Sequence, residues 1–220
     1  MHKTVQNLID IQKKIQSKVN ELNYSDYYPK IIAVSKTFKI DHLMPIIEHG
    51  HIHFGENKVQ EAIEKWTEIK NKNEKIKLHM VGKLQTNKVK FVVKLFDYIH
   101  SVDNIKLAKK ISEEQKKLNK QIKVFIQINI GNEPQKSGVE INKANEFFES
   151  CKKLQLDVIG TMCLPPDDNN SETYFSKMLN INDELKLKEI SMGMSNDYLN
   201  AIKFKSTFVR IGTSIFGERS

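Results

Sequence analysis

The chain has 220 residues, 39% of them hydrophobic and 28% charged, and a formal net charge of +8. This composition supports a sizeable core, and no apolar run approaches the roughly 18 residues of a membrane-spanning helix. Residues 1–20 lack the apolar core of a signal peptide, and Cys151 and Cys163 show neither a disulfide framework nor metal-type spacing. We therefore expect a cytoplasmic protein with reduced cysteines and no metal site.

The excess of positive charge comes almost entirely from lysine. Of the 35 Lys and Arg residues, only Arg210 and Arg219 are arginines. The lysines are spread along predicted helices without interleaved aromatic residues, which favours a solvated surface over a nucleic-acid patch. We expect neither nucleic acid nor a membrane as a partner, although a basic nucleic-acid-binding protein remains an alternative.

Strand-like and helix-like segments alternate along the whole chain. Apolar residues at near-helical spacing predict an amphipathic helix over residues 5–22, and a continuous apolar run then predicts a strand buried on both faces. The predicted strands cover residues 31–35, 51–55, 77–81, 98–102, 122–130, 156–162, 190–194 and 207–211. The helices predicted between them cover residues 41–48, a segment around Trp66, and residues 85–95, 103–119, 141–154, 171–187 and 196–204. Asp41 and Asp103 are predicted N-caps, and Ser195 is expected at the start of the last helix.

Eight strand-then-helix units without a linker predict a parallel sheet closed into a (β/α)8 barrel. We expect residues 1–220 to form a single α/β domain with an extra N-terminal helix. An open, doubly wound sheet is the alternative fold. It is disfavoured because no glycine-rich dinucleotide fingerprint follows the first strand.

In such barrels the functional site lies at the carboxyl ends of the strands. The residues expected at this rim are Lys36, Glu56, Asn57, Gly82, Lys83, Asn129, Met162, residues 192–195, Arg210, Gly212 and Thr213. Lys36 ends the first buried strand, and an amine in a partly desolvated place can lose its proton and form a Schiff base. The alternative is an ordinary solvated lysine.

Two segments near the carboxyl terminus predict an anion site. Phosphate in this fold is often bound after strands seven and eight, beside a helix N-terminus. Ser195 offers a hydroxyl there, Gly212 allows close backbone approach, and Thr213 adds a second hydroxyl. An ordinary helix cap at Ser195 and a simple turn at Gly212 and Thr213 are the alternatives.

Five motifs, in order, carry a resemblance: IIAVSKT, HFGENKVQEA, HMVGKLQTNKVK, SMGMSNDY and TFVRIGTSIFGER. They resemble those of the pyridoxal phosphate homeostasis proteins over essentially the whole chain. The resemblance implies the barrel fold of the alanine racemase N-terminal domain and pyridoxal 5′-phosphate (PLP) as the cofactor. The chain departs modestly from the family pattern at Lys83 and around residues 161–165.

The resemblance also implies roles for individual residues. It makes Lys36 the lysine that forms a Schiff base with PLP and Arg210 the arginine that faces the pyridine nitrogen. It places Asn57 in the pocket near the cofactor. The phosphate contacts it implies are Ser195, Gly212 and Thr213. It leaves the roles of His79, Asn87 and Met162 open.

The expected function is PLP holding rather than fast catalysis. Arg210 can donate a hydrogen bond but not a proton to the pyridine nitrogen, and an unprotonated ring is a poorer electron sink. The chain ends soon after the eighth unit, so we expect it to lack the second, β-rich domain of alanine racemases. We predict a monomer that carries or buffers PLP, affects amino-acid and keto-acid balance, and supplies apo PLP-dependent enzymes. No catalytic residue is assigned; the alternative is a small PLP-dependent amino-acid racemase in which Lys36 serves one face of the substrate.

Overall fold

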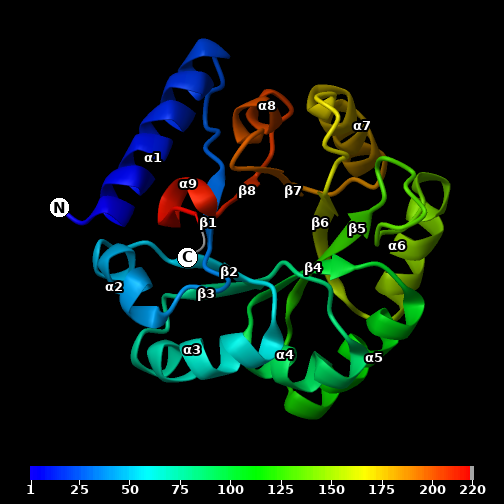
Figure 1. Ribbon diagram of the computed structural model, residues 1–220. Coiled ribbons are helices and arrows are strands. Elements are labelled where there is room, and N and C mark those ends of the chain that lie inside the picture. The colour runs from blue at the N-terminus through cyan, green and yellow to red at the C-terminus, as the bar shows by residue number, and fades with distance from the viewer. Residues whose placement is uncertain (219–220) are drawn as a thin grey trace.

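The computed structural model describes residues 1–218, so that Arg219, at the end of the last motif, and Ser220 lie outside the described residues. Eight parallel strands pair in chain order, and the last pairs with the first to close a barrel (Figure 1). The strands are β1 (Lys30–Val34), β2 (His53–Glu56), β3 (Lys77–Met80), β4 (Tyr98–Val102), β5 (Lys123–Ile128), β6 (Asp157–Cys163), β7 (Glu189–Met194) and β8 (Phe208–Ile211). The predicted (β/α)8 barrel is confirmed.

Helices surround the barrel, and all but the first and the last connect consecutive strands (Figure 1). They are α1 (Lys3–Glu21), α2 (Ile40–Glu48), α3 (Val59–Lys72), α4 (Val89–Leu95), α5 (Ile105–Leu118), α6 (Ala144–Lys153), α7 (Ser171–Glu184), α8 (Tyr198–Lys203) and α9 (Thr213–Phe216), with short 3-10 turns η1 (Thr86–Lys88) and η2 (Ile141–Lys143). The extra helix α1 packs against α2, α8 and α9, and Asn7 Nδ2 donates to the Ile215 carbonyl over 2.9 Å. Within residues 1–218, no helix is long and apolar enough to cross a membrane.

Apolar side chains fill the layer between barrel and helices and part of the barrel interior. Ile32, Phe125, Met162 and Phe208 form a buried cluster contributed by four strands. Met162, whose role was left open, is fully buried in this cluster and therefore fills the barrel core. A larger cluster, which includes Trp66, joins the outer faces of the strands to the helices. The continuous apolar strands follow from this burial on both faces.

The ends of several elements differ from the prediction. Asn104, not Asp103, caps α5, because its Oδ1 accepts a hydrogen bond from the Leu107 N–H over 2.9 Å. Lys39 occupies the N-cap position of α2, with Asp41 in the first turn. Ser195 precedes α8 in a turn and does not start the helix, because Asp197 Oδ1 accepts from the Met194 N–H and closes that turn first.

Candidate functional site

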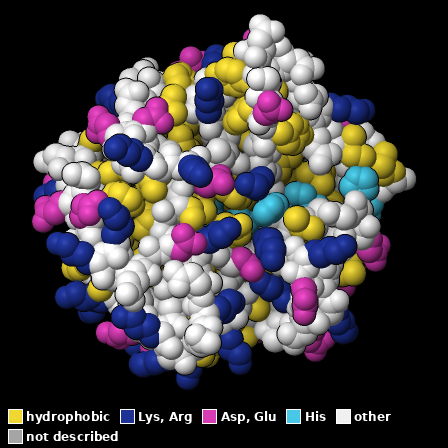
Figure 2. Space-filling model, turned by 180° about the vertical axis from the view of Figure 1, so that it is seen from behind, with side chains coloured by type: hydrophobic (Ala, Val, Ile, Leu, Met, Phe, Trp, Pro, Cys, Tyr) yellow, Lys and Arg dark blue, Asp and Glu magenta, His cyan; other side chains and the backbone are white. Residues whose placement is uncertain are grey.

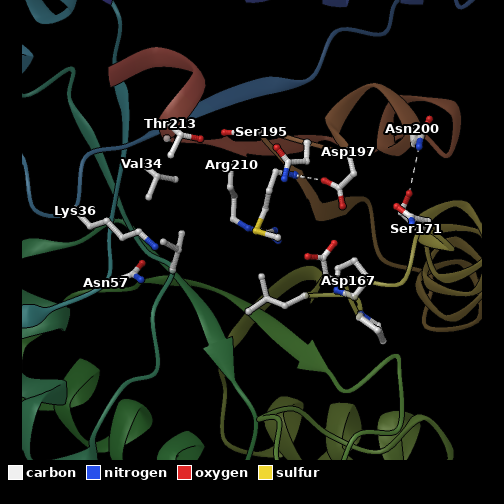
Figure 3. A pocket seen from close by; sticks show the side chains of 18 residues that line it. Val34, Lys36, Asn57, Asp167, Ser171, Ser195, Asp197, Asn200, Arg210 and Thr213 are labelled. Carbon is white, nitrogen blue, oxygen red and sulfur yellow. Dashed lines mark hydrogen bonds between the residues drawn. The ribbon is translucent and has the colours of Figure 1, made fainter. Parts of the chain in front are cut away.

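A cavity of about 570 Å³ opens at the carboxyl ends of the barrel strands (Figure 3). All six predicted site residues line it: Lys36, Asn57, Ser195, Arg210, Gly212 and Thr213. They lie at or just after the ends of β1, β2, β7 and β8. These strands are distant in the chain but converge at one rim because β8 pairs with β1. The structure therefore brings all six predicted residues together.

The polar groups of the cavity occupy different sides of it. Lys36 and Asn57 lie at one side in Figure 3, Arg210 lies between them and Asp197, and Thr213 and Ser195 lie along one edge. Apolar side chains complete the walls: Val34, Val81, Leu164, Pro165 and Met194. An amine, a guanidinium and two hydroxyls thus face a partly apolar space, an arrangement typical of small-molecule sites.

Lys36 is held at the start of a strained turn. The next residue, Thr37, has φ +69°, which is uncommon for a β-branched side chain. Its main-chain N–H donates to Glu61 Oε1 over 2.6 Å. Lys65 Nζ, in turn, donates to Glu61 Oε1 over 2.9 Å and to the Ser35 carbonyl over 2.8 Å. Helix α3 therefore clamps the residues on both sides of Lys36.

A buried carboxylate supports this clamp. Glu56 is fully buried, and its Oε1 accepts from Ser35 Oγ over 2.7 Å, Lys65 Nζ over 2.9 Å and Trp66 Nε1 over 2.9 Å. The Lys65 side chain is only 6% exposed, so both partners of this ion pair are desolvated. Burial acts to raise the pKa of Glu61, but hydrogen bonds from Lys65 and Thr37 outweigh it and lower that pKa. Glu56 was expected at the rim. It is instead buried, and it supports the Lys36 turn through its contacts with Ser35 and Lys65.

The guanidinium of Arg210 is locked by two hydrogen bonds. Nη1 donates to Ser191 Oγ over 2.7 Å, and Nη2 donates to the Cys163 carbonyl over 2.8 Å. Arg210 is 4% exposed, and burial lowers its pKa, while Cys163 and the nearby Asp197 act to raise it. Burial also raises the pKa of Asp197. The hydrogen bond from the Met194 N–H and the charge of Arg210 act to lower that pKa but do not outweigh burial. A cation fixed by two hydrogen bonds therefore lines the cavity.

Two glycines shape the backbone of the site. Gly193 has φ +90°, and a Cβ there would lie 2.6 Å from the Ala201 Cβ, so the turn that carries Ser195 requires glycine. A Cβ on Gly82 would lie 2.5 Å from the Asn57 carbonyl oxygen. The glycine after β3 thus lets the backbone of Asn57 pass close by at the rim.

Several cavity residues were not singled out from the sequence. Asp167 and Asn169 come from the loop after β6, Ser171 is the first residue of α7, and Asn200 on α8 donates to Ser171 Oγ over 3.2 Å. The polar run directly after Pro165 and Pro166 is the signal that could have indicated this part of the rim. Asp197 lies two residues after Ser195 and was recognised only as part of a motif.

Other residues considered from the sequence lie away from the cavity. Asn87 is exposed on η1, and His79 is fully buried inside the barrel. Asn129 organises its own loop through hydrogen bonds with the Glu133 backbone, and Lys83 is exposed outside the lining. In the part of the chain that the structure describes, no group of three His, Cys, Asp or Glu residues is placed to hold a metal ion.

Comparisons with known proteins agree on one family. The family described as "Alanine racemase, N-terminal domain" matches residues 11–220. The pyridoxal phosphate homeostasis protein of Pasteurella multocida (strain Pm70) is 37% identical over 228 residues, covering 97% of each chain. The protein of the same name from Escherichia coli (strain K12) is 31% identical and covers 100% of this chain and 98% of its own.

Solved structures show the same relationship. PipY of Synechococcus elongatus PCC7942, solved with PLP bound, has a TM-score of 0.80 at 31% identity, covering 92% of this chain and 100% of that chain. Alanine racemase of Clostridium difficile 630 shares the fold at 18% identity, with a TM-score of 0.68, and this chain spans 57% of it. The resemblance inferred from the five motifs is confirmed, and the chain belongs to the pyridoxal phosphate homeostasis protein family.

Proposed function

We propose that the chain binds PLP in the cavity at the carboxyl ends of the strands and serves in PLP homeostasis. The observation that supports this most strongly is the meeting of Lys36, Arg210, Ser195 and Thr213 around one space of about 570 Å³. The chemistry of these groups fits the parts of PLP: an amine for its aldehyde, a hydrogen-bond donor for its ring nitrogen, and hydroxyls for its phosphate. PipY, a close structural relative, is known with PLP bound.

Each residue has a distinct proposed role. When bound, PLP would supply an aldehyde, and Lys36 would offer the amine that can condense with it and release water. Arg210 donates an N–H to the pyridine nitrogen and is held for this task by Ser191 and Cys163. Ser195, Thr213 and the backbone at Gly212 surround the phosphate, and Asn57 lies beside the Lys36 end of the cavity.

The lining favours holding over racemisation. Racemisation needs an acid and a base on opposite faces of the substrate carbon. Besides Lys36 and Arg210, the titratable side chains of the described lining are Asp167 and Asp197, with no tyrosine, histidine or cysteine, and Arg210 lies between Lys36 and Asp197 (Figure 3). Arg210 cannot protonate the ring nitrogen, which weakens the cofactor as an electron sink. We therefore propose that the chain carries PLP and releases it to apo PLP-dependent enzymes.

The covalent step is tested by reducing the protein–PLP mixture with borohydride and locating the added mass in peptides. Wild-type protein should gain the PLP absorbance band and carry the label at Lys36. Lys36→Ala should lose both, whereas the control Lys83→Ala, at an exposed lysine outside the cavity, should keep both. A wild-type protein that cannot be reconstituted with PLP, or a label on another lysine, would contradict the proposal.

The racemase alternative has its own test. Single-enantiomer amino acids are incubated with the PLP-loaded protein and separated by chiral chromatography. Turnover that depends on Lys36 would favour the racemase. Transfer to an apo-enzyme, measured as restored activity of that enzyme, would support the carrier role.

We also propose that residues 1–220 act as one PLP-binding unit, in the cytoplasm and as a monomer. Burial raises the pKa of the Cys151 and Cys163 thiols to about 12, which suits cysteines that stay reduced and unreactive. Light scattering during gel filtration tests the monomer, and cell fractionation tests the location.

A further inference from the structure

A row of polar side chains crosses the inside of the barrel and ends on Arg210. Ser191 Oγ, which accepts from Arg210, lies 2.9 Å from His100 Nδ1. His100 Nε2 lies 2.9 Å from His79 Nδ1, and His79 Nε2 lies 2.9 Å from His53 Nδ1. The row therefore joins β8, β7, β4, β3 and β2 by four consecutive hydrogen bonds. None of its members except Arg210 lines the PLP cavity.

The aromatic core holds the histidine rings in place. His79 stacks on Tyr98 with ring centroids 4.2 Å apart, and His100 stacks on Phe125 at the same distance. His79, His100 and Ser191 are fully buried, whereas His53, at the start of β2, is half-buried. On the face opposite to that of Figure 1, histidine side chains are visible near the middle, among lysines (Figure 2). The row thus runs from the cavity towards the amino-terminal end of the barrel.

The histidines of the row are neutral near pH 7. Burial is the largest cause that lowers the pKa of His79 and of His100 well below 6.5, and neighbouring histidines or Arg210 lower them further. Burial also lowers the pKa of His53, to about 4. A neutral imidazole has one donor and one acceptor nitrogen, so each ring must pass the hydrogen bond on in a single direction.

Arg210 sets that direction. A guanidinium has donors and no acceptor, so Ser191 Oγ must accept from Arg210. If the Ser191 hydroxyl donates to His100 Nδ1, every hydrogen bond of the row has one donor and one acceptor, and each imidazole carries its proton on Nε2. In the opposite direction Ser191 Oγ would accept twice and its own proton would lack a partner in the row. A buried polar proton without an acceptor is costly.

We propose that Ser191, His100 and His79 are positioning residues that hold the Arg210 guanidinium towards the PLP cavity, with the donor direction running from Arg210 to His53. The row does not act as a proton relay into the cavity, because Arg210, its member at the cavity, cannot give up or accept a proton at ordinary pH. The part that concerns PLP rests on the proposed function; the donor direction does not.

The donor direction is tested without PLP. Long-range ¹H–¹⁵N spectra distinguish the two tautomers of each histidine, and single histidine variants assign the signals. We expect His53, His79 and His100 as neutral Nε2–H tautomers at pH 7. In Ser191→Ala, where Arg210 no longer imposes a direction, His100 should show a mixture of tautomers. Nδ1–H tautomers at His79 and His100 in the wild type would overturn the assignment.

The positioning role is tested with a matched pair of serine variants. Ser191→Ala removes the hydroxyl between Arg210 and His100, whereas Ser101→Ala removes a buried hydroxyl on β4 that makes no hydrogen bond. We expect Ser191→Ala to weaken PLP binding about 10-fold and to change the pH at which the PLP absorbance shifts, as the loss of one charge-assisted hydrogen bond implies. Ser101→Ala should change the Kd by less than about 2-fold.

Two further variants test the positioning role if Ser191→Ala is poorly folded. Ser191→Thr keeps the hydroxyl and should restore the wild-type PLP spectrum, and His79→Gln should shift that spectrum from a more distant position in the row. Equal PLP affinity and equal spectra for Ser191→Ala and Ser101→Ala would overturn the positioning role. Failure of wild-type protein to bind PLP would contradict the proposed function alone and leave the tautomer result standing.

Discussion

The main-chain N–H of Thr37 donates to Glu61 Oε1 over 2.6 Å, and this contact holds the left-handed turn that presents Lys36. A β-branched residue at φ +69° stores strain that the surroundings must oppose. Lys65 completes the restraint, since its Nζ contacts both Glu61 and the Ser35 carbonyl. The Lys36 side chain is therefore positioned by contacts from helix α3 as well as by its own strand.

Removal of the Glu61 carboxylate should loosen this turn. Glu61→Ala leaves the Thr37 N–H without its acceptor and is expected to lower the free energy of unfolding by about 1–3 kcal/mol. It should also slow the reaction of Lys36 with PLP. Urea unfolding and stopped-flow absorbance measure the two effects. Glu68→Ala, at an exposed position of the same helix, is the control; an equal effect at Glu68 would contradict the role of Glu61.

Breaking the ion pair between Lys65 and Glu56 should lower the free energy of unfolding by more than Glu61→Ala does. Lys65→Met leaves the fully buried Glu56 carboxylate without its cation, and the expected loss is about 3–5 kcal/mol. Glu56→Gln combined with Lys65→Met removes both charges and should recover part of that loss. Urea unfolding of the two single variants and the double variant gives the coupling energy. Strictly additive losses would show that the two side chains do not stabilise each other.

Lowering the pH should destabilise the protein at pH values well above those at which carboxylates titrate. Burial lowers the pKa of His51 and His53 to about 4 from an ordinary value of 6.5. Between these values the unfolded chain binds more protons than the folded one, so stability falls as pH falls. Each group contributes about 2 kcal/mol of loss between pH 6.5 and pH 5. Urea unfolding at several pH values should give a shallower dependence for His51→Gln than for wild type; identical slopes would contradict the assignment.

The turn before Ser195 should tolerate no side chain at Gly193. Gly193→Ala combines a positive φ with a Cβ 2.6 Å from the Ala201 Cβ, so we expect a loss of about 2–3 kcal/mol and weaker PLP binding. Gly50→Ala is the matched control, because Gly50 has φ +95° with nothing within 4 Å of a Cβ. It should cost about 1 kcal/mol and leave PLP binding unchanged. Similar losses of stability at both glycines would show that the positive φ alone, and not the contact with Ala201, causes the destabilisation at Gly193.

Much of the site was predictable because a parallel barrel converts strand ends into neighbours. Once residues 31–35 and 207–211 are recognised as strands, Lys36, Arg210 and Thr213 must lie at one rim. The five motifs supplied the expected role of each residue, and the cavity contains all six. Cap positions were predicted less well, since Asn104 and Asp103 offer similar side chains and only the local geometry selects one.

By itself the sequence determined the alternation of strands and helices, the family, and the identity of the residues at the rim, because these follow from local periodicity and contiguous motifs. Only the tertiary structure decided what surrounds them. The Thr37–Glu61 contact spans 24 positions and the His100–Ser191 contact spans 91. Such pairs leave no periodic signal, because a hydrogen bond depends on where barrel closure brings two side chains and not on their spacing in the chain.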